Sequence, residues 1–488
     1  MILNYIIIAF YSGSLFVILL YSLLQLELVF NYKKAKKQKK TYPKEPKDWP
    51  MVSVQLPLFN EKYVVERLLK AISNLDYPKS KLEIQVLDDS TDDSKFITKR
   101  LTKDLKEKGL DIKYIHRRRR ANYKAGALKE GLTQAKGEFI VVFDADFLPP
   151  SNWLKKTIPH FNTAEIGVVQ TRWGHVNRNY SLLTKIQAFA LDFHFSIEQV
   201  GRSYGGHFIN FNGTAGVWRK TCIEDAGNWE GDTLTEDLDL SYRAQLKGWK
   251  FTYLEEVVTP AELPVVLSAA RSQQFRWNKG AAENFRKNFR SVINSKTLPF
   301  KTKLHSLFHL LNSSMFLLIL IVAVLSIPIL YIKYQQSALD FIFYILAIMG
   351  VSTFIFIYGY WTSYKQMHPV RIKSFFEFLV LFISFFSIAM GLSVHNTLAI
   401  LEGHFNKKSA FIRTPKFDIA SSKDTWKGKM YVNKKLSILN GIEILLFGYF
   451  LYGLYSAYLT QDFGLVIFHI MLAFGFGFIS FKTIFSKA

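Results

Sequence analysis

Long apolar segments at both ends of the sequence restrict where the rest of the chain can fold. The first, Ile2–Phe30, is almost unbroken, and the others all follow residue 303. These later segments are Phe308–Ile332, Phe341–Trp361, Phe375–Leu401, Ile438–Leu459 and Phe463–Phe485. Each is close to or longer than the roughly 20 residues that an α-helix needs to cross a bilayer. The first is too long for a signal peptide and has no basic start, so we predict a retained anchor.

Positive charge is concentrated beside these segments. The net charge is +23, and one cluster, Lys33–Lys40, follows the first segment while another, Arg286–Lys303, precedes the next. Such clusters mark the cytoplasmic side and contact anionic lipid headgroups. We therefore predict a multi-pass membrane protein with residues 32–303 in the cytoplasm (of the bacterial inner membrane, if the source is bacterial) and no nucleic-acid partner. The single cysteine, Cys222, excludes a disulfide framework and a cysteine-based metal site.

The lysine-rich stretch Glu402–Lys435 conflicts with a simple count of membrane crossings. If every apolar segment crosses, this stretch falls outside, against the positive-inside rule. An interfacial or re-entrant helix over Phe375–Leu401 removes the conflict. The sequence thus predicts an N-terminal anchor over 1–31, a cytosolic domain with interfacial helices over 32–303, and a C-terminal membrane region over 304–488 that includes the stretch 402–435.

Between the anchor and residue 303, apolar runs alternate as in a soluble α/β domain. The predicted strands are Met51–Leu56, Leu82–Leu87, Ile112–Ile115 and Glu138–Phe143. The predicted helices between them are Tyr63–Leu75, Lys95–Lys108 and Lys124–Ala135. This alternation indicates a doubly wound, mostly parallel sheet. Ligands of such sheets bind beyond the carboxyl ends of the strands. The residues at those ends are Pro57–Glu61, Asp88, Asp89, Arg117–Arg120, Asp144 and Asp146. Their mixture of acids and bases suits a nucleotide diphosphate.

Asp144 and Asp146 form the candidate metal site. On a strand that continues past Phe143, the two side chains share one face, roughly 6.5–7 Å apart along the chain. Two hard oxygen ligands with open coordination positions suit Mg²⁺ or Mn²⁺ bridging a diphosphate. Taken alone, an Asp-x-Asp pattern is more often a solvated loop after a strand, so the assignment depends on the other motifs.

Thr235-Glu236-Asp237 is the candidate catalytic motif. Thr235 is a plausible N-cap, which places both acids in the first turn of a helix. An acceptor hydroxyl that attacks an anomeric carbon needs a carboxylate to take its proton. We assign this role to Asp237, with Glu236 in support. Alone, the motif is equally typical of a helix start with favourable acids.

Gln273, Arg276 and Trp277 are spaced to share one face of a helix. Arg276 suits a diphosphate, Gln273 can hydrogen-bond a sugar, and Trp277 offers a flat platform to a sugar ring. A membrane-surface helix with an aromatic anchor is the alternative interpretation of these three residues alone.

In combination, the motifs resemble the membrane-bound family 2 glycosyltransferases. These include cellulose synthase, hyaluronan synthase and, most similar, the cellulose-synthase-like A group of mannan and glucomannan synthases. The resemblance is carried by Gln170–Gly174, Phe211–Trp218, Thr233–Gln245, Pro260–Pro264 and Gln273–Trp277. It extends from about Val52 to Gly280 and implies a GT-A fold.

The resemblance implies a role for each matching residue. The nucleotide sugar would contact Pro57, Glu61, Asp88, Asp89, Lys124, Asp144, Gln273 and Arg276. The metal, Mg²⁺ or Mn²⁺, would be held by Asp144 and Asp146, and the acceptor by Asn212, Gly213, Thr214 and Trp277. Phe411, Arg413, Thr414 and Lys416 resemble a cytosolic gating loop that closes over the nucleotide, which again keeps the stretch 402–435 inside.

The expected reaction is a single inverting displacement that converts an α-linked donor into a β-linked product. Arg276 and the metal stabilise the departing nucleotide diphosphate while Asp237 deprotonates the acceptor. We predict a β-glycan synthase that also translocates its product, with GDP-mannose as donor and GDP-glucose or UDP-glucose as alternatives. A homodimer is possible if one chain forms too small a channel. The alternative is a single addition to a lipid acceptor such as a polyprenyl phosphate or ceramide, which needs neither gating loop nor channel.

Overall fold

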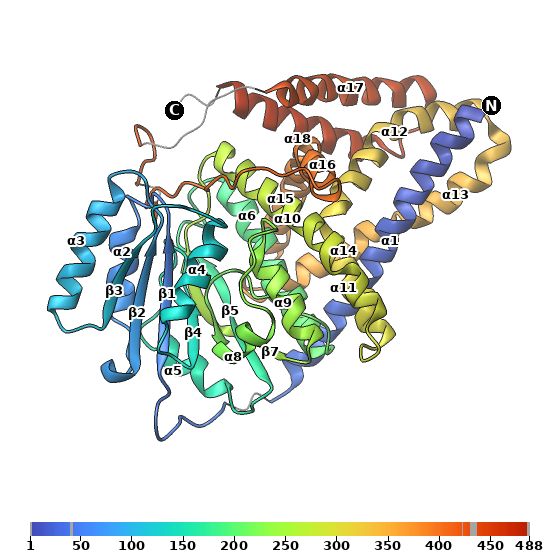
Figure 1. Ribbon diagram of the computed structural model, residues 1–488. Coiled ribbons are helices and arrows are strands. Elements are labelled where there is room, and N and C mark those ends of the chain that lie inside the picture. The colour runs from blue at the N-terminus through green and yellow to red at the C-terminus, as the bar shows by residue number, and fades with distance from the viewer. Residues whose placement is uncertain (1, 40–41, 422, 430–436, 486–488) are drawn as a thin grey trace.

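The computed structural model describes residues 2–39, 42–421, 423–429 and 437–485. Within these residues, a seven-stranded sheet has the order β3-β2-β1-β4-β6-β5-β7 (Figure 1). Its strands are β1 (Val52–Leu58), β2 (Leu82–Asp88), β3 (Ile112–His116), β4 (Phe139–Val142), β5 (Ile166–His175), β6 (Gly216–Arg219) and β7 (Lys250–Ala261). Strand β6 is antiparallel to β4 and β5, and the other pairs are parallel. The predicted doubly wound, mostly parallel sheet is confirmed.

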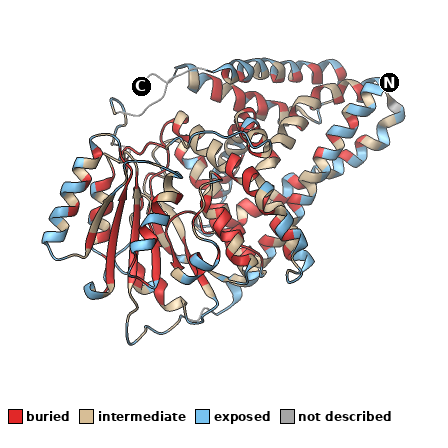
Figure 2. Ribbon diagram, viewed as in Figure 1, coloured by how far each residue is buried: buried red, intermediate tan, exposed pale blue. Residues whose placement is uncertain are grey.

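Helices cover both faces of the sheet. One face packs on α2 (Val65–Ser73), α3 (Ser94–Glu107) and α5 (Trp153–Thr157). The other packs on α4 (Tyr123–Gln134), α8 (Lys220–Asp225) and α9 (Glu236–Leu246). Since both faces are covered, the central strands β1, β2, β4 and β6 are mostly buried, as Figure 2 shows, whereas most residues of the outer strands β3 and β7 are partly exposed.

Strand β1 places apolar side chains on one face of the sheet and polar side chains on the other. Val54 and Leu56 lie in the apolar core against α2. Between them, Gln55 is fully buried and donates a hydrogen bond to Gln85 of β2 at 3.0 Å. Successive residues of a strand face opposite sides, so the polar side chains of β1 pair beneath the opposite layer of helices.

The remaining helices form a second, mainly apolar part beside the sheet (Figure 1). They are α1 (Ile2–Lys37), α6 (Leu182–Phe193), α7 (Gln199–Tyr204), α10 (Leu267–Asn294), α11 (Phe300–Leu310), α12 (Met315–Gln335), α13 (Asp340–Met349), α14 (Val351–Tyr364), α15 (Ile372–Gly391), α16 (Ser393–His404), α17 (Ile438–Thr460) and α18 (Val466–Phe485). Six helical segments of the described chain are long and apolar enough to cross a membrane. They are 2–37, 312–335, 340–364, 372–391, 438–460 and 466–485. This composition is that of a membrane protein.

The predicted segment Phe375–Leu401 is two helices, α15 and α16, that meet at Leu392. Just before α15, the Met367 sulfur lies 3.9 Å from the guanidinium of Arg172, at the end of β5. After α16, Lys416 contacts Asp146 in the α/β part. Both ends of the helix pair therefore lie against the α/β part. Although α15 alone is long enough to cross a membrane, this path supports the re-entrant interpretation, which stays a prediction.

Candidate active site

A cavity of about 200 Å³ lies beyond the carboxyl ends of β1 and β4, between the α/β part and α10. Of the residues predicted for the site, it is lined by Pro57, Glu61, Asp89, Lys124, Asp144, Asp146, Asn212, Gly213, Glu236, Asp237, Gln273, Arg276, Trp277, Phe411, Arg413, Thr414 and Lys416. Ligand pockets usually measure about 300–1,000 Å³. The volume is small because side chains of the segment 411–416 occupy part of the cavity.

The Asp-x-Asp motif lies in a turn rather than on a continuing strand. Strand β4 ends at Val142, and the Phe147 N–H donates to the Asp144 carbonyl at 3.1 Å. The expectation of an extended strand through both carboxylates was therefore wrong. The Asp144 carboxylate pairs with Lys124 at 2.6 Å, and the buried Asp146 carboxylate pairs with Lys416 at 2.7 Å. The turn still directs both acids into one cavity.

The side chains around this turn are of kinds that bind a divalent cation. Two carboxylates are supplemented by His175, at the end of β5, which lines the same cavity. Both of its ring nitrogens are buried without a hydrogen-bond partner among the described residues. Burial, followed by the charges of Arg178 and Arg172, lowers the pKa of His175 to about 3, so the ring is neutral. Carboxylate oxygens and neutral imidazole are ligands that Mn²⁺ accepts. The sequence reasoning assigned no role to His175.

Glu236 and Asp237 occupy the first turn of α9, where the helix dipole favours negative charge. Thr235 takes the N-cap position but makes no capping hydrogen bond; its hydroxyl instead accepts a hydrogen bond from Asn284 at 2.9 Å. Burial, and then the charge of Glu236, raise the pKa of Asp237 to about 7. Burial likewise raises the pKa of Glu236. A carboxyl group with a pKa near 7 is suited to accept a proton.

Gly213 brings the backbone close to this acid. Its φ of 78° lies in the left-handed region that glycine adopts without strain. A Cβ at this position would lie 3.0 Å from the Asp237 Oδ2 atom. The Gly213 carbonyl accepts a hydrogen bond from Lys124 at 2.8 Å, so Lys124 links this turn to Asp144. Burial lowers the pKa of Lys124, but Asp144 and Glu236 outweigh it and raise the pKa.

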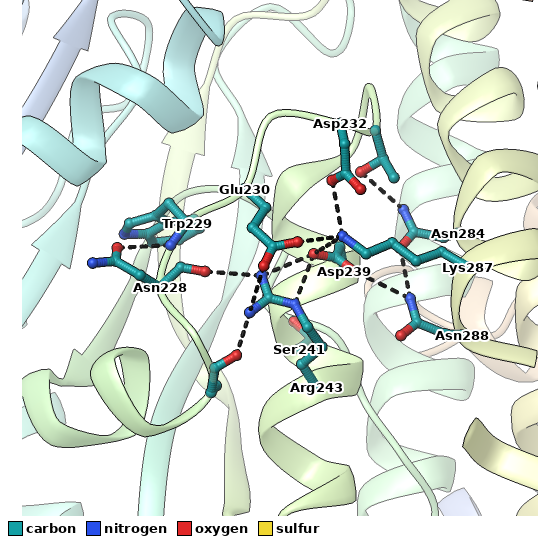
Figure 3. A network of polar contacts seen from close by, with 12 residues as sticks. Asn228, Trp229, Glu230, Asp232, Asp239, Ser241, Arg243, Asn284, Lys287 and Asn288 are labelled. Carbon is teal, nitrogen blue, oxygen red and sulfur yellow. Dashed lines mark hydrogen bonds and ion pairs between the residues drawn. The ribbon is translucent and has the colours of Figure 1, made fainter. Parts of the chain in front are cut away.

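A polar network behind α9 holds the helix in place (Figure 3). Asp239 is fully buried and accepts hydrogen bonds from Arg243 at 2.9 Å, Lys287 at 3.1 Å and Asn288 at 3.2 Å. Lys287 also reaches Glu230, at 2.6 Å, in the loop before the helix. Because Lys287 and Asn288 belong to α10, this network fixes α9 against the helix that carries Arg276.

Gln273, Arg276 and Trp277 share one face of α10, as predicted, and that face lines the cavity. Arg276 lies over the Phe411 ring at 4.4 Å and donates a hydrogen bond to the Thr414 hydroxyl at 2.8 Å. Burial lowers the pKa of Arg276 to about 10, which leaves it charged at neutral pH. Its charge is thus available to an anionic ligand.

The segment after α16 crosses the mouth of the cavity. Arg413 binds both carboxylate oxygens of Glu61, at 2.8 and 2.7 Å. The buried Glu262 accepts the backbone N–H groups of Phe417 at 2.7 Å and Ile419 at 3.2 Å. The predicted gating-like segment is therefore in contact with both the α/β part and α10. Residues 422 and 430–435 of the predicted stretch 402–435 lie outside the described residues.

Two predicted site residues do not line the cavity. The Asp88 carboxylate is fully buried, where it accepts the Ser90 N–H at 2.8 Å and the Tyr114 hydroxyl at 2.9 Å. Thr214 is also fully buried, and its hydroxyl accepts the Asp144 N–H at 2.9 Å. Both side chains support the shape of the site from behind. Contact with a nucleotide sugar or acceptor would have to come from their neighbours.

The basic turn near β3 contributes to the site through two arginines. Arg117 holds both oxygens of Asp89, at 2.7 and 2.5 Å. Arg120 lines the cavity and lies 3.4 Å above the Phe59 ring. The sequence left open whether this turn was only a solvated loop. In the structure, Arg117 and Arg120 are part of the cavity wall or directly behind it.

The sheet and the helices that cover it form a domain of the GT-A type. A solved structure of the same fold is that of the mannosyltransferase PcManGT from Pyrobaculum calidifontis, obtained with GDP-Man and Mn2+. It has a TM-score of 0.56 and 18% sequence identity, and the match covers 82% of this chain and all of that one. At that identity, the likeness concerns the fold alone.

Sequence comparison finds a matching family. Residues 50–280 match the family described as Glycosyltransferase like family 2. The chain is 46% identical over 269 residues to the probable glucomannan 4-beta-mannosyltransferase 11 of Oryza sativa subsp. japonica, covering 53% of this chain and 46% of that protein. It is 42% identical over 268 residues to the glucomannan 4-beta-mannosyltransferase 1 of Cyamopsis tetragonoloba, covering 54% and 51% respectively.

The chain therefore spans about half the length of the curated relatives it matches. The resemblance inferred from the motifs, to glucomannan and mannan synthases within family 2, is confirmed for this domain.

Proposed function

We propose that this chain transfers mannose from GDP-mannose, with inversion, to a growing β-linked mannan or glucomannan. The observation that carries the proposal is the gathering of Asp144, Asp146, Asp237, Arg276 and Trp277 in one cavity. These residues come from three motifs spread over more than a hundred positions of the sequence. The identity of 46% to a probable glucomannan 4-beta-mannosyltransferase over the same domain supports the choice of sugar.

Asp237 is the proposed base. Its carboxylate lies beside the Gly213 turn, and Trp277 lies on the same cavity wall as Arg276. An acceptor sugar stacked on Trp277 would present a hydroxyl to Asp237, which takes the proton as oxygen attacks the anomeric carbon. The bond to the diphosphate breaks on the opposite face. An α-linked donor thereby gives a β-linked product in one displacement.

Positive side chains stabilise the leaving nucleotide diphosphate. Lys124, which pairs with Asp144, and Arg276 both line the cavity, and both are charged at neutral pH. A bound Mg²⁺ or Mn²⁺, held by Asp144 and Asp146, would supply further charge neutralisation of the diphosphate. In a cavity screened from water, such charges act more strongly than in solution.

Lys416 and Arg413 are two further positive side chains that line the same cavity. They now pair with Asp146 and Glu61, and a diphosphate with a cation entering the cavity would compete for them. We propose that the segment 411–416 withdraws to admit the donor and returns over it, with Phe411 and Thr414 in contact with Arg276.

The membrane arrangement follows from the same proposal. Residues 1–31 anchor the chain, residues 32–303 lie in the cytoplasm, and residues 304–488 form membrane and interfacial helices. The cluster Lys33–Lys40, whose first lysines lie in the last turns of α1, supports this orientation. The product would pass from Trp277 into the adjoining helices, of one chain or of a homodimer.

Nucleotide release by detergent-purified protein tests the proposal. GDP-mannose, GDP-glucose and UDP-glucose are supplied separately with Mn²⁺, and free GDP or UDP is measured. We expect release to be fastest from GDP-mannose and to be lost in Asp237→Asn. Preference for UDP-glucose would contradict the proposed donor, and no release from any donor would contradict the proposed activity.

A further inference from the structure

A buried chain of polar side chains runs from the membrane helix α1 to the active-site cavity. Gln25 of α1 donates a hydrogen bond to the Glu198 Oε1 atom at 2.8 Å. The Glu198 Oε2 atom lies 2.7 Å from the His194 Nδ1 atom, and the His194 Nε2 atom lies 3.0 Å from the Asn212 Nδ2 atom. Asn212 lines the cavity next to Gly213, whose turn approaches Asp237.

The helix that carries His194 and Glu198 is irregular at this point. Between α6 and α7, residues His194–Glu198 form a turn of π-helix. Such turns are rare and occur frequently at functional sites, because they redirect side chains that a regular helix would turn elsewhere. Glu198 is 4% exposed, and Arg202 lies 3.5 Å from its carboxylate. A buried glutamate needs such partners to stay charged.

Donors and acceptors along this chain follow from the atoms that face each other. Burial raises the pKa of Glu198, but Arg202 and His194 outweigh it and lower the pKa to about 2, so Glu198 is a carboxylate. A carboxylate only accepts, hence the His194 Nδ1–H donates to Glu198, and the His194 Nε2 atom, which faces the Asn212 Nδ2 atom, accepts from the Asn212 amide. On the other side, the Gln199 Nε2–H donates to the Asn212 Oδ1 atom at 2.6 Å.

The Asn212 amide is therefore oriented from both sides. Its oxygen is bonded to Gln199, and one N–H is bonded to His194. Among the described residues, the second N–H has no acceptor, and Asn212 itself lines the cavity. This N–H is available to an oxygen atom of a ligand close to the Gly213 turn and hence to the proposed base.

We propose that His194 and Glu198 are positioning residues that fix the Asn212 amide, so that its free N–H donates a hydrogen bond to a hydroxyl oxygen of the acceptor sugar. The inference rests on the proposed function, because it takes the ligand beside Asp237 to be a glycan acceptor. It adds to that function a contact between Asn212 and the acceptor that determines specificity. His194 and Glu198 orient this contact without touching the sugar. It also links α1, through Gln25, to the acceptor end of the site.

Steady-state kinetics with a defined acceptor test this inference. Wild type, His194→Ala, Asn212→Ala and the double variant are compared with GDP-mannose, Mn²⁺ and β-1,4-mannotetraose. A neutral hydrogen bond corresponds to about a three- to tenfold change in affinity. We expect either single variant to raise the KM for the acceptor by that factor. For His194→Ala, which lies outside the cavity lining, the KM for GDP-mannose and its hydrolysis to GDP without acceptor should stay within about twofold of wild type.

The double variant separates positioning from other roles. If His194 acts through Asn212, the double variant has the same acceptor KM as Asn212→Ala alone, because the shared hydrogen bond is already lost. The inference would be overturned if the increases in acceptor KM of the two single variants multiplied in the double variant. It would also be overturned if GDP-mannose hydrolysis by His194→Ala fell together with acceptor affinity. Glu27→Gln is the matched control, because Glu27 is another α1 residue that pairs with a histidine, His305, away from the cavity. It should leave the acceptor KM unchanged.

A different result would point to the proposed function itself. If wild-type protein neither hydrolyses GDP-mannose nor transfers from it, the proposed donor is wrong, and the acceptor contact is wrong with it. Donor hydrolysis by wild type with equal acceptor KM in every variant would overturn only the role of His194 and Glu198.

Discussion

Replacement of Asp237 by asparagine, together with the pH dependence of the wild type, tests the proposed base. Burial and Glu236 raise the pKa of Asp237 from an ordinary 3.8 to about 7. A general base must be deprotonated, so transfer activity should be present above this pKa and lost as pH falls through it. At pH 6, about a tenth of the Asp237 carboxyls are ionised, so kcat/KM should be about a tenth of its plateau.

The assay is transfer from radiolabelled GDP-mannose between pH 5 and 8.5. Asp237→Asn should lower kcat by about 10²- to 10⁴-fold at every pH. It should not destabilise the protein, since it replaces a carboxylate whose ionisation is opposed by burial. Asp225→Asn is the matched control, because Asp225 is an exposed acid that pairs with Lys247 outside the cavity. A flat profile down to pH 5, or full transfer by Asp237→Asn, would refute the assignment.

Three further substitutions test separate parts of the site. Gly213→Ala places a Cβ 3.0 Å from the Asp237 carboxylate, at a backbone φ of 78°. Transfer activity should therefore fall at least tenfold while the protein still folds. Activity within twofold of wild type would contradict the close approach. Asp146→Asn should weaken Mn²⁺ binding about tenfold or more, measured by electron paramagnetic resonance of free Mn²⁺, and unchanged binding would exclude Asp146 as a ligand. Glu262→Gln weakens the anchor of the segment after α16, so trypsin should cleave that segment, which contains Lys416, about tenfold faster; equal cleavage rates would show that Glu262 does not hold it.

Much of the α/β part follows from local sequence patterns. Strands β1 to β4 were predicted within a few residues because alternating or continuous apolar runs end in turns of polar residues. The antiparallel strand β6 is different: it has four residues, and its place between β4 and β5 depends on partners far away in the sequence. No local pattern specifies such a pairing.

In the candidate site, too, local patterns predicted some features and could not predict others. Spacing alone placed Gln273, Arg276 and Trp277 on one helix face, because a helix repeats every 3.6 residues. The direction of the Asp88 side chain could not be predicted, since one step along a strand turns it from the cavity to the core.

The contribution of Glu262 was equally hidden. Its partner, the Phe417 N–H, is 155 positions away in the sequence. The motif Pro260–Pro264 drew attention to this region without giving its role. His175 follows directly after the motif Gln170–Gly174, so that motif was the available signal.

We infer that this chain polymerises mannose into a β-linked glycan, and analysis of the product tests this inference. Purified protein is incubated with GDP-mannose and Mn²⁺, and the product is sized and treated with β-mannanase. We expect a long, water-insoluble or gel-excluded polymer that β-mannanase degrades and that Asp237→Asn does not form. A short, lipid-extractable product carrying a single mannose would contradict it and would assign the enzyme to single addition on a lipid acceptor.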